Sequence, residues 1–133
     1  MSFLRKLAAL LALLLVASMP VASVGGDGGL VNLPGGGGRS ARQTIPTTEN
    51  MILSLPLSMW GSVAYIHSYP CSTVTVMQTT SGLLVIPSNV MEQLIASGVR
   101  GLGITFVAPT GARLFVEVIF NPEEQTATVL VTP

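Results

Sequence analysis

Four side chains that combine an apolar body with a polar tip lie within ten residues of this chain: Trp60, Tyr65, His67 and Tyr69. Alternate residues of an extended strand project from the same face, so Tyr65, His67 and Tyr69 are expected to share one face. Such side chains are typical of wet recognition surfaces for a peptide, a glycan or another subunit. A half-buried strand face under a loop is the ordinary alternative. The sequence therefore offers these four residues as a candidate binding surface.

The residues that could carry out catalysis are few. His67 is the only histidine and Cys71 the only cysteine, and the only aspartate, Asp27, lies in a glycine-rich segment. Four residues of extended strand separate His67 from Cys71 by about 13 Å, too far for a thiolate–imidazole pair, although a turn at Pro70 would shorten this distance. No Ser–His–Asp arrangement can be proposed. We expect a protein that is not an enzyme, with a small secreted hydrolase as the least favoured alternative.

The first 23 residues have the order of a secretory signal peptide. Arg5 and Lys6 precede an apolar run from Leu7 to Ala17, and small residues follow up to Ser23. The run has the length of a signal peptide core and is shorter than the ~20 residues of a membrane-spanning helix. We expect cleavage near Ser23 and a secreted or periplasmic protein with no membrane span. An uncleaved segment that anchors the protein in the inner membrane is the alternative.

The charge of the remaining chain excludes several classes of partner. Without residues 1–23 the chain has four arginines and six acidic residues, a formal net charge of −2. Nucleic-acid binding needs a dense basic surface, and so does binding to anionic lipid. One histidine, one cysteine and scattered glutamates do not have the spacing of a zinc site. We therefore expect no nucleic acid, no metal and no cofactor.

Cys71 has no second cysteine with which to form an internal disulfide. In an oxidising compartment such a thiol is either buried and inert or paired with another chain. Free cysteines behave as small buried hydrophobic residues, which favours the inert state. An intermolecular disulfide through Cys71 is the alternative.

Residues 24–50 are rich in glycine and are predicted to form a flexible arm. Leu30, Val31 and Leu33 interrupt the arm and could form a docking strand that adds to the sheet edge of a partner. Incidental apolar residues in a linker are the alternative. Arg39 and Arg42 lie in the same arm and are a candidate processing site for a protease, or else simply solvated charge.

Residues 51–133 are predicted to form a single domain. Asn89 and Glu92 resemble a capping box and Gly98 a C-terminal glycine, so a short helix is expected at about 90–97. The stretch 112–120 is apolar on both faces apart from Arg113 and Glu117, which predicts a central strand, or one that lies between the sheet and a helix. Period-two patterns and short apolar runs place the strands at 51–57, 63–69, 72–79, 83–86, 102–108, 112–120 and 126–132.

These patterns predict a small α+β domain with a predominantly antiparallel sheet, one short helix and a C-terminal three-stranded meander. A β-sandwich is the alternative. The expected function is that of an exported, non-enzymatic binding or assembly module of the periplasm or the cell surface, engaging a protein partner. Low charge and exposed strand edges also fit a self-associating structural surface or pilus-like subunit, which is the runner-up.

Overall fold

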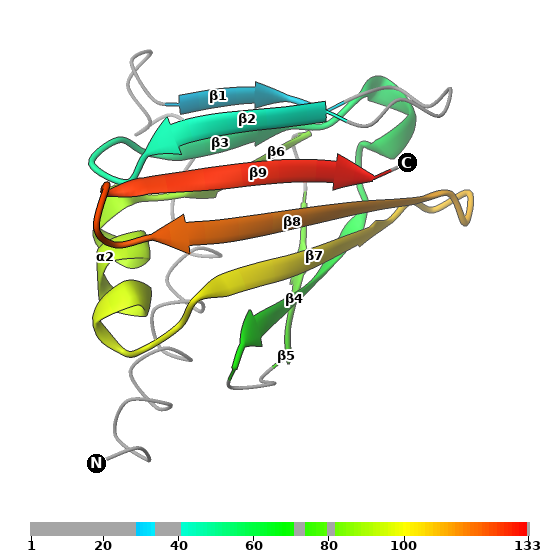
Figure 1. The fold of residues 1–133 in the computed structure, drawn as a ribbon. Coiled ribbons are helices and arrows are strands. Elements are labelled where there is room, and N and C mark those ends of the chain that lie inside the picture. Colours follow the sequence, from blue (N-terminus) through cyan, green and yellow to red (C-terminus); the bar gives the residue numbers. More distant parts are fainter. Residues whose placement is uncertain (1–28, 34–40, 71–73, 80–81, 133) are drawn as a thin grey trace.

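The computed structural model describes residues 29–33, 41–70, 74–79 and 82–132. The expected signal peptide at 1–23, the arginine Arg39 and the cysteine Cys71 lie outside these residues. The described part is mostly β, with two sheets and one short α-helix (Figure 1). The helices are the 3-10 turn η2 (Leu57–Met59) and the α-helix α2 (Ser88–Ala96). The strands are β1 (Gly29–Asn32), β2 (Ala41–Pro46), β3 (Met51–Ser54), β4 (Val63–Tyr69), β5 (Val74–Gln78), β6 (Leu83–Ile86), β7 (Gly101–Val107), β8 (Arg113–Asn121) and β9 (Thr126–Thr132).

The larger sheet, sheet B, has six strands in the order β2-β9-β8-β7-β4-β5, and every neighbouring pair is antiparallel. The smaller sheet, sheet A, has the order β1-β3-β6, with β1 parallel to β3 and β3 antiparallel to β6. The sequence predicts most of these strands within one or two residues, but it does not predict the division into two sheets. That division depends on long-range pairing, which periodicity alone does not encode.

One hydrophobic core lies between sheet B and the layer formed by sheet A and helix α2. The strands of sheet B alternate between buried and more exposed residues, so only one of its faces contributes to this core. Helix α2 contributes three buried side chains to the same core: Val90, Met91 and Leu94. The opposite face of sheet B is here called the outer face.

Helix α2 begins differently from the sequence prediction. Pro87 is its N-cap, and no capping hydrogen bond forms from a side chain at that position, so the expected capping box of Asn89 and Glu92 is wrong. The N–H of Ser88 instead donates to Oδ1 of Asn50, at 3.0 Å. The far end agrees with the prediction, because Gly98 has a φ of +90° there. A distant residue thus replaces the local cap.

The range 24–50, predicted as a flexible arm, contains two strands of the fold. Strand β1 pairs with β3 and strand β2 pairs with β9. Val31, Leu33 and Ile45 are buried in the common core. These three side chains are the physical reason for the difference, because buried apolar area offsets the entropy cost of ordering the glycine-rich chain. The described parts of this range, 29–33 and 41–50, therefore belong to the domain.

Candidate functional site: the outer face of sheet B

Strand β4 brings three of the four predicted binding residues onto one face. Tyr65, His67 and Tyr69 alternate with the buried residues Ala64 and Ile66, as the period of two predicts. Both tyrosines are exposed and the histidine is half-buried. The three residues therefore lie on the outer face of sheet B.

Tyr69 lies flat on the neighbouring strand. A Cβ atom placed on Gly103 of β7 would come within 2.6 Å of the Tyr69 Oη and within 3.3 Å of two ring carbons. Gly103 is paired with His67 on one side and with Glu117 on the other. The absence of a side chain at Gly103 thus creates the space that the Tyr69 ring occupies.

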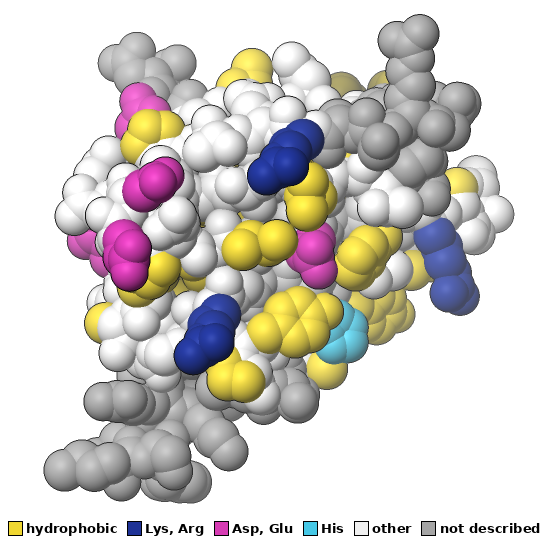
Figure 2. All heavy atoms as spheres, in the orientation of Figure 1, with side chains coloured by type: hydrophobic (Ala, Val, Ile, Leu, Met, Phe, Trp, Pro, Cys, Tyr) yellow, Lys and Arg dark blue, Asp and Glu magenta, His cyan; other side chains and the backbone are white. Residues whose placement is uncertain are grey.

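Neighbouring strands extend the apolar character of this face. Tyr65 of β4 pairs with Val76 of β5 on one side and with Thr105 of β7 on the other. Thr105 pairs in turn with Phe115 of β8. Figure 2 shows hydrophobic side chains spread over the face, with charged groups of both signs among them. The exposed large hydrophobic residues at outward positions of sheet B, with their exposed fractions, are Tyr65 38%, Tyr69 43%, Val74 48%, Val76 58%, Phe115 37% and Ile119 44%.

A shallow groove of about 350 Å³ crosses this face. It is lined by side chains from four adjacent strands: Tyr65, His67, Val74, Thr105, Val107 and Arg113. These six include one guanidinium, one imidazole and two hydroxyls, and none of them is acidic. The two valines and the tyrosine ring supply apolar walls. The groove therefore combines apolar surface with polar groups that can donate hydrogen bonds.

Trp60 is separated from the other three predicted residues. Its indole lies against Gly82, and its Nε1 donates a hydrogen bond to the carbonyl of Leu55 at 3.1 Å. Leu55 follows β3 and Gly82 precedes β6, so Trp60 packs at one end of sheet A. The Trp60 side chain nevertheless remains 52% exposed.

Two of the predicted docking residues, Leu30 and Val31, belong to strand β1, which pairs with this chain's own β3; the third, Leu33, directly follows that strand. Val31 and Leu33 are buried, whereas Leu30 is 49% exposed. The backbone carbonyl of Leu30 accepts a hydrogen bond from Nε2 of Gln43 at 3.0 Å. The candidate processing residue Arg42 is exposed in strand β2. In the structure the predicted docking segment is thus packed and paired within this chain.

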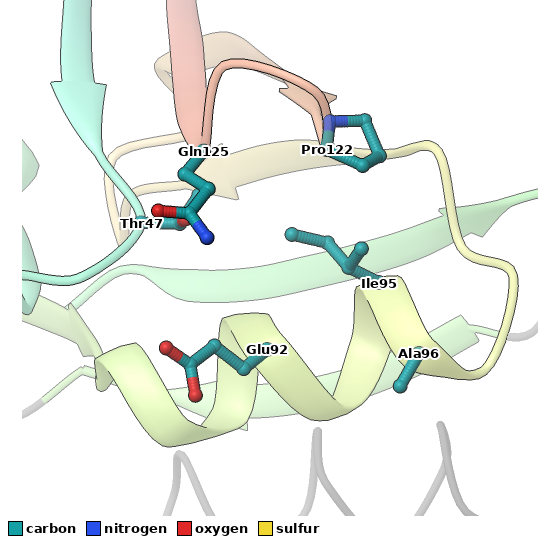
Figure 3. Close-up of a pocket in the computed structure, with 6 residues that line it drawn as sticks. All are labelled: Thr47, Glu92, Ile95, Ala96, Pro122 and Gln125. Atoms are coloured by element: carbon teal, nitrogen blue, oxygen red, sulfur yellow. The ribbon is translucent and has the colours of Figure 1, made fainter.

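A second cavity, of about 370 Å³, lies between helix α2 and the turn that joins β8 to β9 (Figure 3). The side chains of Glu92 and Ile95 face it from the helix, and those of Pro122 and Gln125 from the turn. Gln125 has a φ of +55°, and its carbonyl accepts the N–H of Thr47 at 2.9 Å. This hydrogen bond joins the turn between β8 and β9 to the chain that follows β2.

Sequence reasoning missed the contributions of β5, β7 and β8 to the outer face. Phe115 and Ile119 lie in the predicted strand 112–120, but the sequence pattern alone does not single them out as exposed residues of this face. Val76 and Arg113 become neighbours of the tyrosines only through strand pairing. The period of two assigns a residue to a face, and only the register decides which residues from other strands lie beside it.

The groove offers apolar surface and hydrogen-bonding groups. Within residues 29–33, 41–70, 74–79 and 82–132, no three His, Cys, Asp or Glu side chains are placed to hold a metal ion. None of the helices in this part of the chain is long and apolar enough to cross a membrane. The pairing of His67 with Cys71 involves a residue outside the described part. Comparison of the chain with protein-family models, curated proteins and solved structures gives no match.

Proposed function

We propose that this protein is an exported, non-enzymatic binding module of the periplasm or the cell surface, and that it engages a protein partner through the outer face of sheet B. The uncovered apolar character of this face carries the proposal. On the outer side of strand β8, Phe115 and Ile119 are exposed and alternate with Arg113 and Glu117. A partner that covers this face would account for the exposed apolar side chains.

The composition of the face agrees with a protein interface. Exposed apolar patches on a protein surface mark interaction sites when they are large. Six large apolar side chains are exposed at outward positions of sheet B, and three of them are aromatic. Aromatic residues are enriched in protein interfaces because they bury a large area at a low cost in side-chain entropy.

The proposal includes a finer class for the fold: an α+β domain with a C-terminal meander. Two features support this class. The three C-terminal strands pair consecutively, β7 with β8 and β8 with β9, always antiparallel. Helix α2 packs its apolar face into the hydrophobic core and is therefore an integral element of the domain. The meander places three outward-facing rows of side chains next to β4, which is how the face becomes continuous.

Site-specific photo-crosslinking in the native host tests the proposal. A photoreactive residue at Tyr65 should give a protein adduct, whereas the same residue at Gln93, exposed on α2, should not. The adduct should disappear when Phe115→Ser is introduced on the neighbouring part of the face. Equal adducts at both positions, or none at either, would contradict the proposal. Cell fractionation of the same strain tests the expected export.

Self-association is the second candidate, because strand β5, which is the last strand of sheet B among the described residues, has few of the usual protections of an edge strand. Its described residues, Val74–Gln78, contain neither a charge nor a proline, whereas the opposite edge strand β2 carries Arg42 and Pro46. Charged residues and prolines on edge strands prevent edge-to-edge pairing. Sedimentation velocity should then show a concentration-dependent dimer that Val76→Lys abolishes and that Gln93→Lys, with the same added charge, does not. A monomer at all concentrations would exclude this candidate.

A further inference from the structure

We infer that the groove on the outer face binds an extended peptide segment of a partner, with a carboxylate at the Arg113 end and apolar side chains along the remainder. This inference rests on the proposed function and specifies the chemistry of the partner. Three properties of the groove support the inference: the charge of its lining residues, its length and its apolar walls.

The charge in the groove is one-sided. Arg113 is a permanent cation, and Tyr65, His67 and Thr105 add groups that can donate hydrogen bonds. No acidic residue lines the groove, although the chain without residues 1–23 has a net charge of −2. A planar guanidinium binds a carboxylate through two parallel hydrogen bonds, which a neutral amide cannot accept. A carboxylate is therefore the complementary ligand group.

The acidic residue nearest in the strand register lies outside the groove. In the strand register Gly103 of β7 lies between Glu117 of β8 and His67 of β4. The ring of Tyr69 occupies the space above that glycine. Tyr69 therefore stands between the carboxylate of Glu117 and the imidazole of His67. This arrangement leaves the groove free of a competing anion and gives Tyr69 a positioning role at its border.

The dimensions of the groove fit an extended chain. Arg113 lies on β8 and Val74 on β5, three strand spacings apart, which is about 14 Å. Strand register shifts Val74 by four residues relative to Arg113, or about 13 Å along the strands. The diagonal is therefore about 19 Å, the length of about six residues of extended peptide. Apolar walls at Val107, Tyr65 and Val74 follow this diagonal.

Selection from a random heptapeptide library displayed on phage tests the inference with the full exported chain as target. The selected peptides should be enriched in aspartate or glutamate at one end and in apolar residues elsewhere. A synthetic peptide with the selected consensus, blocked at both termini, is then compared with its glutamate-to-glutamine analogue by calorimetry. The analogue should bind the unaltered protein roughly three- to tenfold more weakly, because one charge-assisted contact at an exposed site is lost.

Two charge variants assign the effect to the groove. Arg113→Gln should bind both peptides with the same weaker affinity, whereas Arg100→Gln, with the same loss of charge outside the groove, should retain the difference. Thermal unfolding of each variant shows whether the fold is retained. Peptides without an acidic preference, or a preference that survives Arg113→Gln, would overturn the inference and leave the proposed function standing. A library that yields no peptide, together with an adduct at Tyr65, would also overturn the inference alone.

Discussion

Replacing Gly103 with alanine should have opposite effects on stability in the presence and in the absence of the Tyr69 ring. Gly103 lies within strand β7, where alanine normally stabilises by about 0.5–1 kcal/mol because glycine loses more backbone entropy on folding. In this protein the new Cβ would lie 2.6 Å from the Tyr69 Oη. The side chain of Tyr69 must therefore move away from β7.

The magnitude follows from the area that the ring would expose. Tyr69 is 43% exposed, so more than half of its surface is covered. If displacement exposes roughly a quarter of a ~200 Å² aromatic side chain, about 50 Å² returns to water, which costs about 1.3 kcal/mol. The net effect of Gly103→Ala is then a destabilisation of about 0.5 kcal/mol. With Tyr69→Ala already present, the same change should stabilise by about 0.5–1 kcal/mol.

Chemical denaturation of the four proteins of this double-mutant cycle measures the coupling, which should be about 1.3 kcal/mol. The control is Gly111→Ala, because Gly111 has a φ of +91° and nothing within 4 Å of an added Cβ. That change should destabilise the protein equally with and without Tyr69→Ala. A stabilisation by Gly103→Ala in both backgrounds would refute the placement of Tyr69 over β7.

Three further experiments test other parts of the fold by denaturation. Gly82→Ala should lower the free energy of unfolding by about 2–3 kcal/mol and shift the fluorescence of Trp60. The reason is that Gly82 has a φ of +73° and that the indole occupies the place of an added Cβ. An unchanged emission spectrum would contradict this contact. Val31→Ser should lower the free energy of unfolding by about 2–3 kcal/mol and Leu30→Ser by less than about 0.5 kcal/mol, since Val31 is buried and Leu30 is exposed. Equal effects would mean that β1 is not part of the domain. Leu94→Ala should cost about 2–5 kcal/mol if helix α2 packs in the core as described, and a cost below about 1 kcal/mol would place the helix outside it.

Much of the local structure could be predicted because its signals are local. The alternation of 63–69 predicts strand β4, and the run 83–86 predicts strand β6, both with the observed bounds. Gly98 ends helix α2 with a φ of +90°, and the N–H of Val99 donates to the carbonyl of Leu94 at 2.9 Å. This is the geometry that a glycine beyond a helix end favours.

Other features could not be predicted because they depend on residues far apart in the sequence. The start of α2 was assigned to Asn89 and Glu92, whereas Asn50, distant along the chain, accepts the first N–H of the helix. The glycine-rich range 24–50 has the composition of a linker, yet Val31 and Ile45 are buried in the core. Composition measures an average tendency, whereas a few buried side chains at the right positions decide whether a segment is ordered.

The sequence by itself determined which residues of each strand share a face, because side chains alternate with a period of two whatever the surroundings. It therefore placed Tyr65, His67 and Tyr69 together, a prediction that strand β4 confirms. Only the tertiary structure decided which residues of other strands stand beside them. Strand register brings Arg113 and Val74 into the same groove, and Gly103 makes space for the Tyr69 ring. Register is fixed by the packing of the whole sheet on its core, which no single segment of the sequence contains.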